Sequence, residues 1–334
     1  MNPHPVTLAD VAREAGTSPS TASRALSGRG YVAPDVRKRL VAVADRLGYV
    51  PNLSARTLKQ RRSRVVGVVV SDLSNPFYAA LAAGAELMLR EANYQTLLLG
   101  DNSDSTQELA GARTFLAMRA PGVIMTPASR APAELLVARG IPVVEVDRRL
   151  ARTSCDAVVI DNERGARDAV THLLELGHTR VALLMAKTTW TTDAGRLRGY
   201  RAAHTAAGVR IERSLVVKVD THDADVPGRI AALLDGERPT AIFAANNQLA
   251  EQTWRVLRRR KLDIPRDVSL VAFDDVPWME MVQPGITAVA QPVYEMGRRA
   301  ALLLLRRLED PSCGRTVEVL EPRLVIRGST GPPR

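Results

Sequence analysis

The sequence lacks the features that mark a membrane, exported or disulfide-stabilised protein. No apolar run approaches the roughly 18 residues that a membrane helix needs. Only two cysteines are present, Cys155 and Cys313, which is too few for a disulfide framework or a four-cysteine zinc site. Asp10, Arg13 and Glu14 stand where the core of a secretory signal would be apolar. We therefore expect a soluble, cytoplasmic protein with no membrane partner.

Signatures of common enzyme classes are also missing. No lysine follows a glycine, which excludes the phosphate-binding loop G-x-x-x-x-G-K-[ST], and neither G-x-S-x-G nor H-E-x-x-H occurs. The five histidines have no metal-ligand spacing, and His178 in Leu-Gly-His is expected to be a structural hydrogen-bonding group. The sequence therefore predicts no catalytic residues, no metal and no cofactor.

The positive charge of the chain is concentrated at one end. Residues 1–64 carry 12 Lys and Arg against 4 Asp and Glu, whereas the other 270 residues carry 34 against 32. A basic surface favours nucleic acid or acidic membranes, although a charged segment can also be no more than a solvated arm. At 334 residues, the chain is long enough for two or three domains. We expect a small basic module followed by a large, nearly neutral body.

The basic module has the pattern of three short helices. Thr7 can cap a first helix that ends at Gly16, and Ser18 can cap a second with Pro19 in its first turn. A third helix is expected over residues 34–47. The inward positions repeat at helical spacing: Leu8, Val11, Ala12, Ala15, Ala22, Ala25, Val36, Leu40, Val43 and Leu47. A bundle without a ligand would explain this spacing, but it would not explain the second helix's polar face of Ser20, Thr21, Ser23 and Arg24. The pattern favours a helix-turn-helix unit whose second helix lies in the major groove of DNA.

A short basic segment, residues 51–62, follows these helices. Asn52 can cap a short helix there, but taken alone the segment also reads as a linker. An isolated helix of this length is marginal in water, so its order could depend on contact with DNA or a partner.

From Arg64 onward, short apolar runs alternate with longer amphipathic segments. Strands are expected at 65–70, 96–99, 122–125, 143–146, 158–160, 181–185, 215–219, 241–244, 268–273 and 286–290. Helices are expected at 77–91, 106–119, 131–139, 164–176, 196–207, 226–234 and 249–260. Such alternation predicts parallel sheets, and the number of units exceeds one comfortable sheet. The predicted fold class is an α-helical helix-turn-helix headpiece followed by an α/β core of two lobes.

Polar residues follow most of the predicted strands, where parallel sheets bind their ligands. They are Ser71, Asp72, Asn75, Asp101, Asn102, Asp147, Arg148, Asp161, Asn162, Asn246, Asn247, Gln248, Asp274 and Asp275. With Arg196, Phe77, Tyr78 and Trp190 nearby in the sequence, this set suits a polyhydroxylated ligand. The alternative is that each Asp or Asn caps the helix that follows it.

Eight stretches of the sequence resemble the lactose-repressor (LacI/GalR) family of bacterial transcription regulators. They are VTLADVAREAGTSPSTASRALSGRGYVAPDVRKRL, LGYVPNLSARTLK, VGVVVSDLSNPFYAALAAG, GIPVVEVDR, THLLELGHTRVAL, RLRGYRAA, IPRDVSLVAFDD and ITAVAQPVYEMGRRAA. Together they span essentially the whole chain in the family's order. The resemblance implies a DNA-binding regulator, most often a repressor, that is controlled by a small metabolite.

For the N-terminal part, the resemblance implies a DNA-binding headpiece over residues 1–50 and a hinge helix over 51–64. Base-reading positions correspond to Pro19, Ser20 and Arg24, and phosphate-contacting positions to Thr7, Ser18, Thr21 and Ser23. The hinge contacts correspond to Asn52, Ala55 and Leu58, with Leu58 as the apolar wedge that kinks a bendable central step. Two headpieces related by a dyad would read a pseudo-palindromic operator in double-stranded DNA.

For residues 65–334, the resemblance implies an effector-binding and dimerisation core similar to a periplasmic sugar-binding protein. One lobe is expected over about 65–161 plus 292–321, and the other over about 162–291 plus 322–330. The effector-contact positions correspond to Phe77, Asp147, Arg196, Asn246 and Asp274. No leucine heptads follow the last predicted strand, so we expect a homodimer and not a tail-assembled tetramer.

The core departs from the family pattern at two places. Asn247 stands where Asp is usual, and the stretch 187–195 is not the usual glycine- and serine-rich one. Arg148 and Arg196 also make a sugar acid or a phosphorylated ligand possible beside a neutral carbohydrate. Other readings stay open at this point: an activator, a regulator that needs a purine-type or phosphorylated co-repressor, and a DNA-binding protein with no effector. A transport-type binding protein would share the core, but it would need an export signal and would have no headpiece.

Overall fold

The structure is a computed structural model that describes residues 6–28, 30–50, 63–150, 154–188, 190–220 and 223–334. The chain divides between Ser63 and Arg64 into two compact units, which are described separately. Within the described residues, none of the helices combines the length and apolar character that a bilayer-spanning segment requires.

The first unit contains three helices, α1 (Leu8–Glu14), α2 (Pro19–Ser27) and α3 (Pro34–Leu47), as predicted. Thr7 and Asp10 form a reciprocal capping box at the start of α1, and the Ser18 hydroxyl accepts the backbone N–H of Thr21 at 3.1 Å at the start of α2. Gly16, between the two helices, has a φ of 62°, which confirms the expected tight bend. The core of this unit is built from small and branched side chains: Val11, Ala12, Ala15, Ala22, Ala25, Leu40, Val43 and Ala44. Val36 and Leu47 are only half-buried, at the edge of this core.

The hinge residues Asn52, Ala55 and Leu58 lie outside the described residues, within 51–62. Their expected roles stay predictions.

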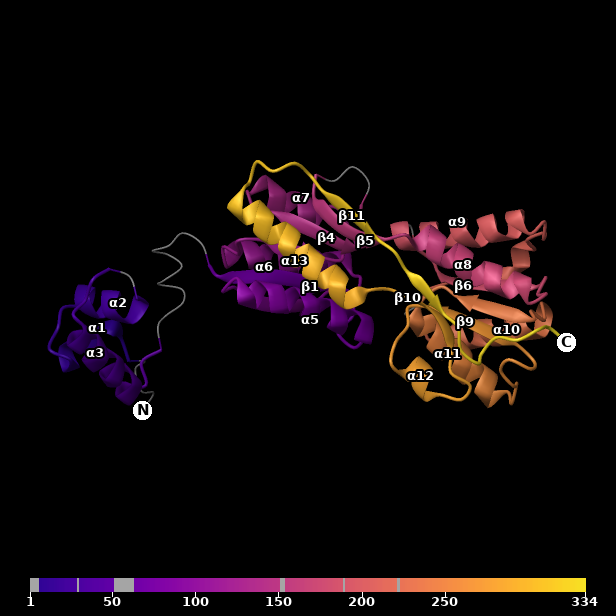
Figure 1. The fold of residues 1–334 in the computed structure, drawn as a ribbon, viewed down its shortest axis with the longest axis horizontal. Helices are drawn as coiled ribbons and strands as arrows, with labels where there is room; N and C mark the ends of the chain where they lie inside the picture. The colour runs from indigo at the N-terminus through magenta and orange to yellow at the C-terminus, as the bar shows by residue number, and fades with distance from the viewer. Residues whose placement is uncertain (1–5, 29, 51–62, 151–153, 189, 221–222) are drawn as a thin grey trace. The chain divides into compact units, whose positions relative to one another are not determined.

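The second unit contains two sheets, and Figure 1 shows each of them covered by helices. The first sheet has the order β11-β5-β4-β3-β1-β2, and all its pairings are parallel. Its strands are β1 (Val65–Val70), β2 (Gln95–Gly100), β3 (Val123–Met125), β4 (Val143–Asp147), β5 (Asp156–Ile160) and β11 (Val317–Leu320). With α5 (Pro76–Glu91), α6 (Ser105–Ala117), α7 (Ala131–Ala138) and α13 (Val293–Glu309), this sheet forms what we call the first lobe.

The second sheet has the order β12-β10-β9-β8-β6-β7, with β12 antiparallel to β10 and the other pairings parallel. Its strands are β6 (Val181–Ala186), β7 (Val216–Val219), β8 (Ala241–Ala244), β9 (Ser269–Phe273), β10 (Thr287–Ala290) and β12 (Arg323–Val325). Its helices are α8 (Asn162–Glu175), α9 (Thr191–Ala206), α10 (Val226–Gly236), α11 (Asn247–Arg259) and α12 (Trp278–Met281), with a 3₁₀ turn at Arg213–Leu215. These elements form what we call the second lobe.

The chain passes between the lobes near Asp161, Gln291 and Glu321, as the strand membership of the two sheets requires. The last of these passages is the extended yellow segment that joins β11 to β12 in Figure 1. These three connecting segments lie outside both sheets. The lobes can therefore move apart or together about them while each sheet stays intact.

The predicted strands and helices of the core are found, most of them with ends within two residues of the expected ones. The exception is α9, which begins at Thr191, five residues before the expected start at 196. Leu215 was expected at the start of a strand, but it lies in the 3₁₀ turn before β7. The helices α12 and α13 and the strands β11 and β12 were not predicted from the sequence. The edge strands β11 and β12 are four and three residues long, too short to give a recognisable alternation.

Glycine allows the closest helix contacts in both lobes. A Cβ on Gly84 of α5 would lie 2.0 Å from the backbone oxygen of Tyr294 in α13, and a Cβ on Gly297 of α13 would lie 2.0 Å from that of Leu81. In the second lobe, a Cβ on Gly199 of α9 would lie 2.2 Å from the Glu163 oxygen of α8. These helices touch through their backbones, which holds the strand ends next to them in fixed positions.

His178 is buried in the second lobe and serves the structural role that was expected of it. Its ring nitrogens lie 2.9 Å from the Thr240 hydroxyl and 2.8 Å from the Gly331 carbonyl oxygen. Burial lowers the pKa of His178. The ring therefore ties the C-terminal segment to the sheet as a neutral group.

Candidate functional site

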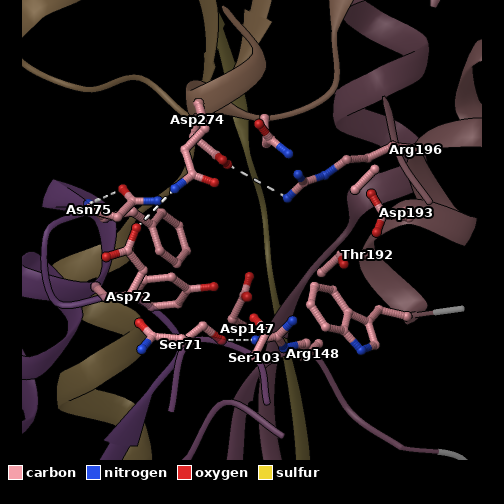
Figure 2. Close-up of a pocket in the computed structure, with 17 residues that line it drawn as sticks. Ser71, Asp72, Asn75, Ser103, Asp147, Arg148, Thr192, Asp193, Arg196 and Asp274 are labelled. Carbon is pink, nitrogen blue, oxygen red and sulfur yellow. Dashed lines mark hydrogen bonds and ion pairs between the residues drawn. The ribbon is translucent and has the colours of Figure 1, made fainter. Parts of the chain in front are cut away.

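A cavity of about 90 Å³ lies between the lobes, beyond the carboxyl ends of the strands. The first lobe contributes Ser71, Asp72, Asn75, Phe77, Tyr78, Asn102, Ser103, Asp147 and Arg148 to its walls, and the second lobe contributes Ala186, Trp190, Thr192, Asp193, Arg196, Asn246, Gln248 and Asp274. All five residues predicted as effector contacts are among them. Figure 2 shows these side chains converging on one space from both lobes.

Asp147 and Asp274 occupy corresponding positions in the two lobes. Asp147 ends β4 and Asp274 directly follows β9, and their φ angles are 69° and 71°. A left-handed backbone is unusual for a residue other than glycine and is found preferentially at ligand sites, where the surrounding structure enforces it. This turn at each strand end directs one carboxylate into the cavity from either side.

Arg196 is held rigidly within the second lobe. Its Nε donates to Asn162 Oδ1 at 2.9 Å and its Nη1 donates to the Ala245 carbonyl oxygen at 2.5 Å. Its Cζ lies 3.8 Å from the centroid of the Phe273 ring, and its Nη2 lies 3.6 Å from Asp274 Oδ1. The guanidinium is thus oriented before any ligand arrives, which reduces the entropy that binding would cost.

Asp274 is also held by neighbours of its own lobe. Its carboxylate accepts the Gln291 amide at 2.5 Å and the backbone N–H of Asn247 at 3.4 Å. Burial raises the pKa of Asp274, while Arg196 and these hydrogen bonds oppose that rise. The carboxylate is therefore a fixed hydrogen-bond acceptor on the cavity wall.

Asp147 differs from Asp274 because, among the described residues, no protein donor binds its carboxylate. Burial raises the pKa of Asp147 to about 6, against the opposing effect of Arg148 and Arg196. Burying an ionised group without a donor costs free energy. A ligand hydroxyl or amine would supply the missing donor.

The capping alternative holds for other strand-end residues. Asn75 Oδ1 accepts the N–H of Phe77 at 3.1 Å, and Asn246 Oδ1 accepts that of Leu249 at 2.8 Å. Asp161 caps α8 in the same way, and Asp275 forms a two-pronged ion pair with Arg327. Asn75 and Asn246 therefore combine a structural role with a place on the cavity wall, whereas Asp275 is structural.

Four wall residues were not predicted from the sequence: Ser103, Ala186, Thr192 and Asp193. Asp193 precedes Arg196 by three residues on α9, so both lie on one helix face. That spacing was a signal that could have identified Asp193. Asn102 and Ser103 have φ angles of 51° and 60°, and this left-handed turn, which places both residues on the cavity wall, is not revealed by the sequence pattern.

In the first unit, the residues predicted to read bases lie on one exposed face of α2. Pro19, Ser20 and Arg24 are exposed, and Arg24 Nε donates to the Ser20 carbonyl oxygen at 3.3 Å. Of the predicted phosphate contacts, Thr7 and Ser18 are exposed, and Thr21 and Ser23 are half-buried. Within the described residues, no cluster of His, Cys, Asp and Glu side chains could hold a metal ion.

Comparison with known proteins identifies the class to which these two units belong. A family model for bacterial regulatory proteins of the lacI family matches residues 7–52, and one for a periplasmic binding protein-like domain matches residues 170–330. The HTH-type transcriptional regulator DegA of Bacillus subtilis is 32% identical over 331 residues, with 98% of each chain covered.

Two solved structures extend this comparison. The transcriptional regulator CelR–cellobiose complex is 31% identical, with a TM-score of 0.74, and the match covers 97% of this chain and 100% of that one. A LacI family regulator from Enterococcus faecium with bound ribose is 29% identical, with a TM-score of 0.73, and the match covers 81% of this chain and 100% of that one. The chain is therefore a DNA-binding transcriptional regulator and not an enzyme. It belongs to the LacI family.

Proposed function

We propose that the protein represses transcription by binding a pseudo-palindromic operator as a homodimer. In this proposal a small carbohydrate-like metabolite, bound between the two lobes, controls the operator affinity. Pro19, Ser20 and Arg24 read bases, while Thr7, Ser18, Thr21 and Ser23 hold phosphates. The hinge residues Asn52, Ala55 and Leu58 act at the operator centre. The protein acts in the cytoplasm, where its DNA partner is.

The observation that carries the effector proposal is the pair of inward carboxylates, Asp147 and Asp274, on either side of Arg196. Each carboxylate accepts two hydroxyl hydrogen bonds, and a guanidinium donates to ring or hydroxyl oxygens. Phe77 and Trp190 add aromatic surface that can cover the apolar face of a sugar ring. The cellobiose and ribose bound to two relatives support the same class of ligand.

The environment of Arg148 supports the inclusion of acidic sugars in the proposed class of effectors. Its side chain is 2% exposed, its Nε has no hydrogen-bond partner, and among the described residues it forms no ion pair with a carboxylate. A ligand carboxylate or phosphate would find there a buried guanidinium that has no carboxylate partner among the described residues.

The test is a thermal-shift screen of the full chain against neutral sugars, sugar acids, sugar phosphates and nucleobases. A ligand at a hundredfold excess over its Kd stabilises the native state by about 2.7 kcal/mol. We expect a sugar or sugar acid to raise the melting temperature of the wild type. The same ligand should not change the melting temperature of the Asp274→Ala variant. A shift given only by nucleobases, or one retained in Asp274→Ala, would contradict the proposed ligand class or site.

A further inference from the structure

Four contacts across the cleft hold the two lobes together in the described structure. Asn247 Nδ2 donates to Asn75 Oδ1 at 3.0 Å, and Gln248 Nε2 donates to Asp72 Oδ2 at 2.9 Å. On the other side of the cavity, the Arg148 Cζ lies 3.6 Å from the centroid of the Trp190 ring, and the Arg149 backbone is hydrogen-bonded to the Thr191 hydroxyl. Each contact joins a residue of the first lobe to one of the second lobe.

With these contacts formed, the cavity is too small for a sugar. Its volume is about 90 Å³. An engineered cavity of about 150 Å³ holds benzene, which is smaller than a sugar ring with its hydroxyl groups, and drug-sized ligands occupy about 300–1,000 Å³. A ligand of the proposed class therefore needs the lobes to separate.

The aromatic surface of the site is also occupied by the protein itself. Arg148 is stacked on the Trp190 ring, and its Nη2 donates to the Ser71 hydroxyl. A guanidinium stacked on a ring leaves that face unavailable to a sugar. Trp190 can cover a ligand through this face only after the contact with Arg148 is broken.

From these observations we infer that the Asn247–Asn75 and Gln248–Asp72 pair is a latch that excludes the effector. The latched arrangement and the effector-bound arrangement compete, so effector binding requires release of the latch. The existence of the latch follows from the cross-lobe hydrogen bonds alone. Its competition with an effector rests on the proposed function.

Asn247 is the residue on which the latch depends. Asn75 Oδ1 already accepts the N–H of Phe77 at the start of α5, so the partner across the cleft must be a donor. The Asn247 amide can donate, whereas an ionised aspartate at this position could not. Asn247 is 5% exposed and does not line the cavity, so changing it removes no group that a ligand in the cavity would contact. The latch thus depends on an amide at position 247.

A first experiment detects the latch without any ligand. The chain has three tryptophans, and Trp254→Phe with Trp278→Phe leaves Trp190 as the fluorophore. In this background of the full chain, Asn247→Ala and Asn247→Asp should increase acrylamide quenching of Trp190, because the lobes separate more often. Asn247→Ala removes the donor without adding charge, and it keeps the test valid if Asn247→Asp folds poorly.

Gln252→Glu is the matched control. Gln252 lies on the same helix, α11, forms no hydrogen bond across the cleft, and the substitution makes the same change of amide to carboxylate. Its quenching should equal that of the background. If both Asn247 variants also equal the background, the latch does not exist.

A second experiment measures the competition with ligand. D-ribose and cellobiose are titrated into the full-length wild type, Asn247→Ala and Gln252→Glu by calorimetry. A buried hydrogen bond of this kind corresponds to about a two- to tenfold change in an equilibrium constant, so a sugar that binds should bind Asn247→Ala up to about tenfold more tightly. Equal affinity in wild type and Asn247→Ala, or weaker binding to Asn247→Ala, would overturn the inference, since the cross-lobe bonds would then not oppose the ligand.

The two experiments separate the latch from the proposed function. If neither sugar binds any variant but Trp190 quenching rises in both Asn247 variants, the latch stands and the carbohydrate effector loses support. If a sugar binds and quenching does not change, the effector proposal stands and the latch is wrong.

Discussion

At the scale of single residues, the buried carboxylate of Asp147 has the clearest energetic consequence. Its folded pKa of about 6 lies above the ordinary value of 3.8, because burial disfavours the charged form. The native state therefore binds this proton more tightly than the unfolded chain does. The contribution of Asp147 to stability falls as the pH rises from about 4 to about 6, and it stays unfavourable above that range.

Asp147→Asn should remove this penalty. We expect the variant to exceed the wild type in free energy of unfolding by roughly 2–3 kcal/mol near pH 7.5. The excess should be much smaller near pH 4, where the folded Asp147 carboxyl group is protonated and no buried charge is present. Urea denaturation of both proteins at the two pH values measures the difference. A difference that is the same at both pH values would show that burial of the charge is not its cause. The stabilised variant should also lose sugar binding, as expected of a site residue that is costly to keep charged.

Arg24 carries the residue-scale prediction for DNA. A bidentate contact between Arg24 and guanine would contribute about 1–3 kcal/mol of discrimination. Arg24→Ala should therefore weaken binding to the operator by roughly ten- to a hundredfold and change binding to random DNA far less. Fluorescence anisotropy measures the affinity for both DNAs. Arg90→Ala, at an exposed position of α5 in the second unit, is a control that removes the same charge. Equal losses on both DNAs would mean that Arg24 contacts only phosphates.

At the scale of elements, the position of the cavity depends on helices that touch through glycine. Because a Cβ on Gly84 would lie 2.0 Å from a backbone oxygen of α13, Gly84→Ala should force α5 and α13 apart. We expect a loss of about 1–3 kcal/mol or more in the free energy of unfolding, as is typical of overpacking.

Gly236→Ala is the matched comparison for this prediction. Gly236 ends α10 and has no atom within 4 Å of its ideal Cβ position, so alanine should be neutral or stabilising there by up to about 1 kcal/mol. Thermal and chemical denaturation compare the two variants. Similar effects of both substitutions would contradict the close-contact account.

Some helices and strands could be predicted from the sequence and others could not, and the reason is whether local chemistry or distant pairing determines them. Helix caps such as Thr7 and Ser18 and fully apolar strands such as Val65–Val70 are set by local chemistry, so they could be predicted closely. The strands β11 and β12 could not, because each is short and is defined by its pairing with β5 or β10, far away in the sequence.

The candidate site was predictable to a similar degree. Strand-end positions and the family resemblance together identified Phe77, Asp147, Arg196, Asn246 and Asp274 as residues of one place, and all five line the cavity. The sequence could not reveal what holds the lobes closed, because Asn247 and Asn75 are 172 positions apart and meet only when both lobes are folded. Their hydrogen bond depends on tertiary structure and on which amide oxygen is already used as a helix cap.

At the scale of the whole molecule, charge is divided between the two units. The basic first 64 residues are expected to contact phosphates, and the nearly neutral core is not. Operator affinity of the full chain should therefore fall by orders of magnitude, roughly a thousandfold, between about 50 and 200 mM salt. Anisotropy titrations over a salt series give the slope. A flat dependence would contradict DNA binding through the basic headpiece.

The proposed function requires that a ligand between the lobes controls binding to DNA. Its most direct test is the affinity of the full chain for an operator selected from a pool of palindromic DNA, measured with and without a sugar that binds. We expect the sugar to change operator affinity by about 5- to 150-fold, which is typical of allosteric coupling. We also expect Asp274→Ala to keep the operator affinity but to lose the response. If the sugar binds the wild type and the operator affinity does not change, the proposed function is wrong.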